Sequence, residues 1–243
     1  MERLEKLVNL VGASPLPHNL REWLGPFTDG VLERLLETSP SRVYQYALAC
    51  KDRPYLAKAR KALVEKDPKS ANELGHGADD RTLLRMVAEA LAETQPDVAY
   101  WIAREVGNEM IMRRAFAYLP SKDSECTVAV RYDFLARYGR RRDLGAVRTS
   151  FVNLAAGEAY EAAAEFKDRV LLRMAGKVLL EEDAEGALSD AQAIGDTSLA
   201  KRAIRVLLHA DPHAAYEGAR EAGDPALYAR ARNAFAQYDP LFA

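Results

Sequence analysis

The 243-residue chain contains only two cysteines, Cys50 and Cys126, and its apolar runs are only a few residues long. Two cysteines so far apart in the sequence are too few for a disulfide framework or a four-ligand zinc site. A helix that crosses a membrane needs about 20 apolar residues, and the amino terminus lacks the charged and apolar order of a signal peptide. The sequence therefore predicts a cytoplasmic protein without a membrane segment.

A strong charge of either sign is also absent, because 34 Lys and Arg residues face 36 Asp and Glu residues and give a formal net charge of -2. The net charge therefore does not indicate a nucleic-acid-binding protein. Any charge that binds a partner must be concentrated locally. Asn and Gln are scarce at ten residues in total. Thermophile proteins favour such a balance, which makes a thermophilic source an expectation.

A repeat of about 28 residues organises most of the chain. Its anchor is a polar residue that ends a short turn, and successive anchors are 28, 28, 35, 25, 28 and 28 residues apart. The seven anchors are Asp52, Asp80, Asn108, Asp143, Asp168, Asp196 and Asp224. Apolar residues recur four and eleven positions after each anchor; in the fourth unit these are Val147 and Leu154. The residue seven positions after the anchor is small in nearly every unit. These offsets fall on one face of a helix, which the anchor opens as N-cap.

A second, shorter helix is predicted before each anchor. A small residue recurs five positions before each anchor, except in the fourth unit, where this position is Tyr138. Each unit is thus a helical hairpin, and the predicted fold is all-α, a right-handed α-solenoid of about seven hairpins. Residues 1–40 are predicted to form a helical cap, and residues 41–243 the repeats, within one continuous domain.

The repeat resembles HEAT-like repeats, through the apolar-basic pairs Leu84-Arg85, Met112-Arg113, Val147-Arg148, Leu172-Arg173 and Ala200-Lys201. The Asp-Pro unit ends, together with Gly195-Asp196 and Gly223-Asp224, look instead like tetratricopeptide repeats. Either resemblance implies an α-solenoid whose concave surface holds a protein or peptide, and sometimes nucleic acid.

A column of basic residues is the first candidate site. Its members are Arg85, Arg113, Arg148, Arg173 and Lys201, with Lys58 and Arg230 one position later in the outer units. One interpretation is a ladder of cations along a phosphate backbone or an acidic peptide. The other, which the HEAT resemblance implies, is that each base bonds an anchor Asp or a helix end of the neighbouring unit.

The irregular step near the middle of the chain supplies the second candidate. Six arginines lie there, facing Asp133 and Asp143: Arg131, Arg137, Arg140, Arg141, Arg142 and Arg148. Their density predicts a cluster that is not paired locally and that binds nucleic acid or an acidic partner. The alternative is a solvated helix end. Trp101 is a further candidate for a binding surface, whereas the tyrosines eight positions before alternate anchors, Tyr44, Tyr100, Tyr160 and Tyr216, are expected in the core.

No Gly-rich phosphate loop, nucleophile elbow or Cys-His pairing is recognised in the sequence, so there is no catalytic constellation to propose. His209, Asp211 and His213 could bind a metal, as could Glu73, His76, Asp79 and Asp80, but helix capping by Asp211 is the expected role. We therefore expect no cofactor and no metal. The sequence predicts a non-catalytic scaffold that holds a protein or peptide, with a nucleic-acid-binding solenoid centred on residues 131–148 as the alternative.

Overall fold

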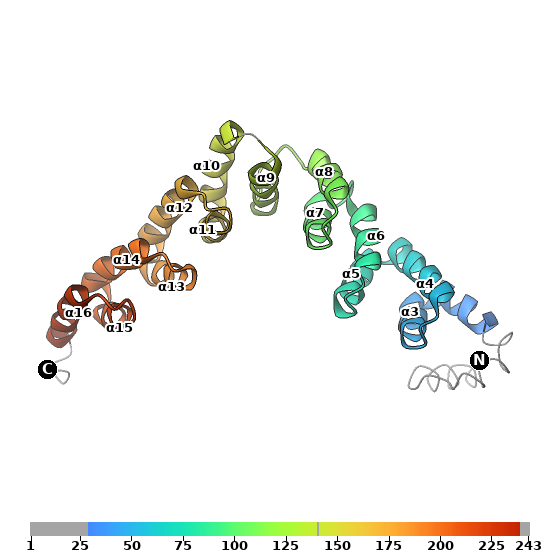
Figure 1. Ribbon diagram of the computed structural model, residues 1–243, viewed down its shortest axis with the longest axis horizontal. Coiled ribbons are helices and arrows are strands. Elements are labelled where there is room, and N and C mark those ends of the chain that lie inside the picture. Colours follow the sequence, from blue (N-terminus) through green and yellow to red (C-terminus); the bar gives the residue numbers. More distant parts are fainter. Residues whose placement is uncertain (1–28, 140, 239–243) are drawn as a thin grey trace. The chain divides into compact units, whose positions relative to one another are not determined.

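The computed structural model describes residues 29–139 and 141–238, the side chain of Arg141 excepted, and every regular element within these ranges is a helix (Figure 1). The chain divides into two compact units, Met1–Leu119 and Pro120–Ala243. Residues 29–38 are helical. Most of the predicted cap lies outside the described residues, so the cap and the single continuous domain stay predictions.

The described part of the first unit contains three hairpins. Their helices are α3 Pro40–Ala49 with α4 Arg53–Lys66, α5 Pro68–Gly77 with α6 Arg81–Leu91, and α7 Pro96–Glu105 with α8 Glu109–Tyr118. The second unit contains four hairpins and one turn of 3₁₀ helix. Their elements are α9 Glu125–Tyr138, η1 Arg141–Asp143, α10 Leu144–Leu154, α11 Ala156–Glu165, α12 Arg169–Glu182, α13 Ala184–Ile194, α14 Thr197–Ala210, α15 Pro212–Glu221 and α16 Pro225–Tyr238.

Within each unit the first helices of the hairpins form one row and the second helices form another (Figure 1). Inside each unit, each helix from α3 on packs against the next along the chain, and second helices also contact one another, as α14 does with α12 and α16. This arrangement is an α-solenoid of stacked helical hairpins, as the repeat predicted. The choice between HEAT-like and tetratricopeptide-like ancestry stays a prediction.

Six of the seven anchors open a second helix in the predicted way. The side chains of Asp52, Asn108 and Asp168 accept backbone N–H groups in the first turns of α4, α8 and α12. Asp80, Asp196 and Asp224 do the same for α6, α14 and α16. These bonds satisfy N–H groups that have no partner inside the helix. Asp52, Asp80, Asn108, Asp168, Asp196 and Asp224 are therefore confirmed as N-caps.

The anchor predicted at Asp143 is wrong. Asp143 lies in the 3₁₀ turn and its side chain makes no capping hydrogen bond. Leu154 and Tyr138, which this anchor placed in the packed columns, are 41% and 38% exposed. The buried residues of α10 are instead Leu144, Phe151 and Val152.

Position 140, which is 28 residues before Asp168, restores the register in this hairpin. Counted from there, Tyr132 occupies the tyrosine column eight positions upstream, and it is fully buried. Asp143 was mistaken for an anchor because it, too, directly precedes a helix. The hairpin is therefore displaced by three residues from the predicted register.

Small side chains let the two rows approach closely. The recurring alanines at the helix contacts are almost completely buried: Ala47, Ala59, Ala103, Ala115, Ala163, Ala175, Ala191, Ala203, Ala219 and Ala231. At Gly75 of α5 the approach is tighter still, because a Cβ atom there would lie 2.7 Å from Leu84 Cδ2 and 3.0 Å from Leu84 Cγ. Leu84 is only 2% exposed and has little room to move.

We expect Gly75→Ala to destabilise the first unit by about 1–3 kcal/mol, because the added methyl overpacks the contact with Leu84. The matched control is Gly77→Ala in the same helix, where a Cβ atom would meet nothing within 4 Å. That change should leave stability equal or raise it by up to about 1 kcal/mol through helix propensity. Urea unfolding followed by circular dichroism measures both. Equal effects of the two substitutions would contradict the close approach.

Candidate binding surface

A buried polar contact joins the first two hairpins. The Tyr44 hydroxyl on α3 donates to Oδ2 of Asp80 at 2.9 Å, and Nε of Arg60 on α4 donates to the same oxygen at 2.8 Å. The other carboxylate oxygen, Oδ1, accepts the backbone N–H groups of Thr82 and Leu83 and thereby caps α6. One carboxylate therefore starts its own helix and holds two side chains of the preceding hairpin.

The same contact recurs in the second unit with the same sequence spacing. The Tyr132 hydroxyl donates to Asp168 Oδ2 at 3.0 Å and Arg148 Nε donates to it at 2.8 Å, from residues 36 and 20 positions upstream. Asp168 Oδ1 caps α12 through Val170 and Leu171. The recurrence shows that this contact is part of the repeat. Sequence reasoning predicted the tyrosine column as core and missed the hydrogen bonds that it makes.

Two further anchors keep part of this arrangement. The Tyr160 hydroxyl donates to Asp196 Oδ2 at 2.9 Å, but Gly176 stands where the arginine would be. The Asp224 carboxylate forms an ion pair with Lys201 Nζ at 2.8 Å, in place of the contact with a tyrosine. Tyr216, in the last hairpin, is only half-buried and its hydroxyl lies 3.0 Å from that of Tyr228.

The shared carboxylates have shifted acid-base properties. Burial by itself raises the pKa of the Asp80 and Asp168 carboxyls, but hydrogen bonds from the arginine, the capped backbone N–H and the tyrosine outweigh it and lower the pKa below its ordinary value. Burial first, and then the hydrogen bond to the carboxylate, raise the pKa of Tyr44, Tyr132 and Tyr160 well above the ordinary value. The charged carboxylate and the neutral phenol are thus the forms that the fold favours.

Asp168→Asn should destabilise the second unit by about 1.5–3 kcal/mol, because it leaves Arg148 without its charged acceptor. The control is Asp211→Asn, an exposed N-cap that accepts only backbone N–H groups, from His213 and Ala214. Asn caps a helix about as well as Asp, so this change should cost less than about 0.5 kcal/mol. Chemical denaturation at neutral pH measures both, and equal losses would show that the Arg148 contact contributes nothing.

The pKa shifts also predict how stability depends on pH. A carboxyl whose pKa is lowered in the folded state stabilises the fold above its unfolded pKa of about 3.9, and this contribution disappears as the pH falls through the folded value. The stability difference between the wild type and Asp168→Asn should therefore shrink below about pH 4. Tyrosines with a raised pKa act oppositely, and their contribution is lost as the pH rises above about 10. Urea unfolding across the pH range tests both slopes, and a difference that is constant with pH would contradict them.

The predicted basic column has mixed outcomes. Arg148 and Lys201 bond the anchor Asp of the next hairpin, which is the structural interpretation. Arg113 pairs with Glu109 on its own helix, with Nε at 2.8 Å from the carboxylate. Three members, Arg85, Arg173 and Arg230, are exposed and form no ion pair within the described residues. Whether the column binds a ligand stays a prediction.

Three of the six arginines of the irregular step, Arg131, Arg137 and Arg148, are paired locally. Arg131 pairs with Asp123, and Arg137 pairs with both Asp133 and Glu165 at 3.0 and 2.9 Å. Arg148 pairs with Asp168. For these three arginines the expectation of no local partner is wrong, because it counted only the acids inside the cluster and not those that the fold brings to it. Whether the cluster binds a ligand stays a prediction.

The remaining members of that cluster are less constrained. Arg142 is exposed and 3.6 Å from the Asp143 carboxylate. Arg140 and the side chain of Arg141 lie outside what the structure describes. Trp101 is half-buried against Tyr100, at 5.4 Å between ring centroids, and the Arg104 guanidinium lies over its indole. Its predicted part in binding is untested by these contacts.

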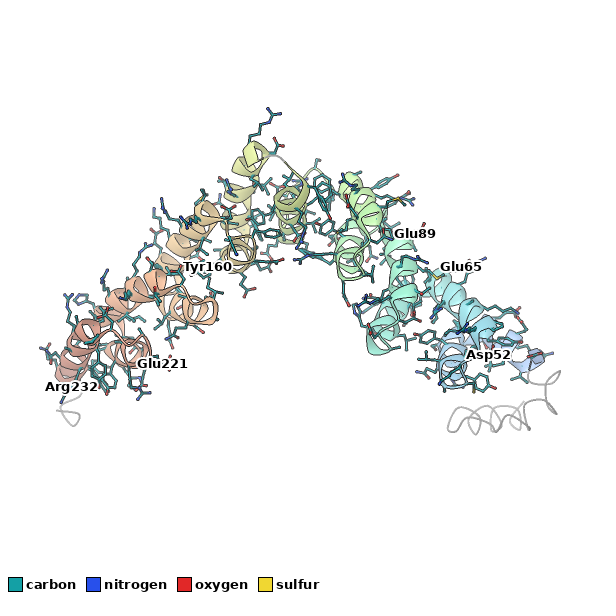
Figure 2. All side chains as sticks on the ribbon, in the orientation of Figure 1. Asp52, Glu65, Glu89, Tyr160, Glu221 and Arg232 are labelled. Atoms are coloured by element: carbon teal, nitrogen blue, oxygen red, sulfur yellow. The ribbon has the colours of Figure 1, made fainter. Side chains whose placement is uncertain are left out.

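A group of arginines, half of which sequence reasoning missed, lies on the last three second helices of the second unit. Six exposed arginines on three consecutive second helices form no ion pair with any described residue: Arg169 and Arg173 of α12, Arg202 and Arg205 of α14, and Arg230 and Arg232 of α16. We call four of them, Arg173, Arg202, Arg205 and Arg230, the basic face. Figure 2 shows side chains tipped with nitrogen along this row. Only Arg173 and Arg230 were predicted, because Arg202 and Arg205 lie outside the column that recurs.

The first helices of the last three hairpins have the opposite charge. Helices α11, α13 and α15 contain seven acidic residues and a single Arg or Lys, whereas α12, α14 and α16 contain eight basic residues and two acidic ones. Glu221 of α15 and Arg232 of α16 mark the two rows in Figure 2. The last three hairpins of this nearly neutral chain therefore have their acidic and basic residues on separate rows.

Folding alone does not account for this segregation. Arg169, Arg173 and Lys177 follow one another at intervals of four residues on α12, and Lys201 and Arg205 do so on α14. Like charges at this spacing destabilise a helix by about 0.2–0.5 kcal/mol per pair. Arg169 is also the first residue of α12, where the helix dipole disfavours a cation. Repulsion of this kind is relieved when an anion binds.

No protein-family model matches the chain, and no curated protein is a significant match. Among solved structures, the chain is similar to one described as a circular tandem repeat protein with novel repeat topology and enhanced subunit contact surfaces. The two are 20% identical, with 97% of this chain and 50% of that chain covered and a TM-score of 0.13. The chain thus spans half of that structure's length, and a likeness at this score supports no argument.

Two further properties complete the description. None of the helices in the described ranges has the length and apolar character that a membrane crossing requires. Within the same ranges, no three or more His, Cys, Asp or Glu side chains are grouped so that they could hold a metal ion. Asp211 caps α15, as expected, and His76 lies 3.2 Å from Glu105.

Proposed function

We propose that this helical-repeat protein is a non-catalytic scaffold that holds a protein or peptide partner. The observation that supports it best is the basic face, whose four arginines are exposed and have no ion-pair partner among the described residues. Unpaired like charges on adjacent helices cost stability, and a partner that supplies anions offsets that cost. The row of second helices offers such a partner a regular surface.

Exposed aliphatic side chains accompany the arginines. Val170 on α12 is 54% exposed and Val206 on α14 is 44% exposed. An apolar contact together with arginines is the composition that protein interfaces favour. A polypeptide can cover the valines and pair with the arginines at the same time.

Nucleic acid is the less favoured partner. The alternative predicted at residues 131–148 depended on arginines without partners, and Arg131, Arg137 and Arg148 are instead held in ion pairs. Proteins that grip single strands stack bases on aromatic rings. Helices α12 and α14 contain no Phe, Tyr or Trp, and the exposed aromatic ring of the three helices is Tyr238 at the end of α16. The acidic first-helix row also repels a polyanion that would wrap around the unit.

Selection from a displayed peptide library on the full chain tests the proposal. The wild type should enrich a common class of sequences that a variant with Arg173, Arg202, Arg205 and Arg230 changed to Ala no longer enriches. Fluorescence anisotropy with the enriched peptides should give a loss of affinity of at least about tenfold in the variant, since several ion pairs disappear together. If no sequence is enriched, or if DNA is retained at about 0.15 M salt while peptides are not, the proposal is wrong.

A further inference from the structure

The basic face has a spacing that restricts what it can bind. Helix α14 contacts both α12 and α16, so the three second helices are consecutive neighbours. Packed helices lie about 8–10 Å apart. Arg173, Arg205 and Arg230 stand one on each of these helices, and the positive charge therefore repeats roughly once per hairpin across the row.

A polypeptide in the extended polyproline II conformation advances about 3.1 Å per residue and has three residues per turn, so every third side chain points in the same direction. Three of its residues consequently cover the distance from one second helix to the next. A segment that crosses the row in this conformation brings every third side chain to a new arginine, while the residues between them lie near Val170 and Val206.

From this match we propose that the basic face binds an extended acidic segment of a partner, with a carboxylate at about every third residue and small or aliphatic residues between. The inference rests on the proposed function and specifies the chemistry of the partner. Arg205 and Arg202 on α14 form the centre of the site, with Arg173 and Arg230 on either side. Arginine suits this role because its planar guanidinium binds a carboxylate through two parallel hydrogen bonds.

A second copy of the chain is the competing occupant, since the first-helix row is acidic. Several of those acids are already engaged within their own chain, however. Glu165 pairs with Arg137, Glu217 pairs with Arg220, and Glu221 accepts a hydrogen bond from Gln192. The acidic row therefore offers a second copy fewer available carboxylates than its composition indicates, which favours a separate acidic segment.

The probe is a fluorescent nine-residue peptide with glutamate at every third position and valine and serine between. Two comparison peptides contain the same residues with the glutamates consecutive, or glutamine in place of glutamate. A surface ion pair changes an equilibrium constant by at most about fivefold, so the spaced peptide should bind the full chain on the order of tenfold more tightly than the glutamine peptide. It should also bind more tightly than the consecutive one, and more weakly as salt rises.

The test variant is Arg173→Ala with Arg205→Ala, and its control is Arg42→Ala with Arg220→Ala, which removes two exposed arginines from first helices. The test variant should lose on the order of tenfold in affinity for the spaced peptide, and the control less than about twofold. The thermal midpoint of the test variant should not fall, because the change removes repulsion between like charges. A fall in the midpoint with unchanged affinity would assign these arginines to folding and overturn the inference.

Other outcomes separate the inference from the proposed function. If the library enriches peptides that lack acidic residues, the acidic segment is wrong and the scaffold proposal stands; if nothing is enriched, both fail. Self-association at low salt that the test variant abolishes, measured by sedimentation velocity, would assign the face to a second copy. Tighter binding of an oligothymidylate than of the spaced peptide would assign it to nucleic acid.

Discussion

A carboxylate shared between neighbouring hairpins is the interaction on which the repeat depends. Its Oδ1 atom caps one helix, and its Oδ2 atom receives a tyrosine and an arginine from the hairpin before, as at Asp80 and Asp168. Because these donors lie 36 and 20 residues upstream, an insertion between them and the carboxylate would break the contact. This spacing is interrupted where the chain divides into its two compact units. The residue 36 positions after Tyr100 is Ala136, which has no carboxylate, and the division lies between these positions.

The sequence predicted the hairpins because each anchor has a local physical cause. An Asp before a helix caps it wherever it stands, so recurrence of Asp with apolar columns located six second helices correctly. The same reasoning failed at Asp143, where the residue in register is Arg140, which is not a capping type. Local chemistry marks a helix start, but only the packed neighbours fix the register. Tyr132, eight positions before residue 140, was the signal that identifies it.

The candidate site was harder to predict because pairing depends on distances between segments remote in sequence. Arg148 and Arg173 both stand five positions after an Asp, and the sequence gives no reason to separate them. In the structure Arg148 bonds Asp168 in a half-buried contact, whereas Arg173 is exposed and forms no ion pair with a described residue. The three-residue displacement of α10 causes the difference, since it places Arg148 at the position that Arg60 holds in the first unit.

Basic residues on second helices fall into two groups, those held by a partner and those without an ion pair among the described residues, and this contrast bears on function. Arg85 of α6, in the first unit, belongs to the second group. In the first unit Lys58 pairs with Glu33, Lys66 bonds the carbonyls of Leu36 and Glu37, and Arg60 bonds Asp80. Such bases are explained by folding, since each satisfies a neighbour. The basic face has no comparable partners within the described residues, although its helices pack in the same way. A shared fold therefore does not account for the unpaired charge, and an anionic partner is the explanation that relieves the repulsion.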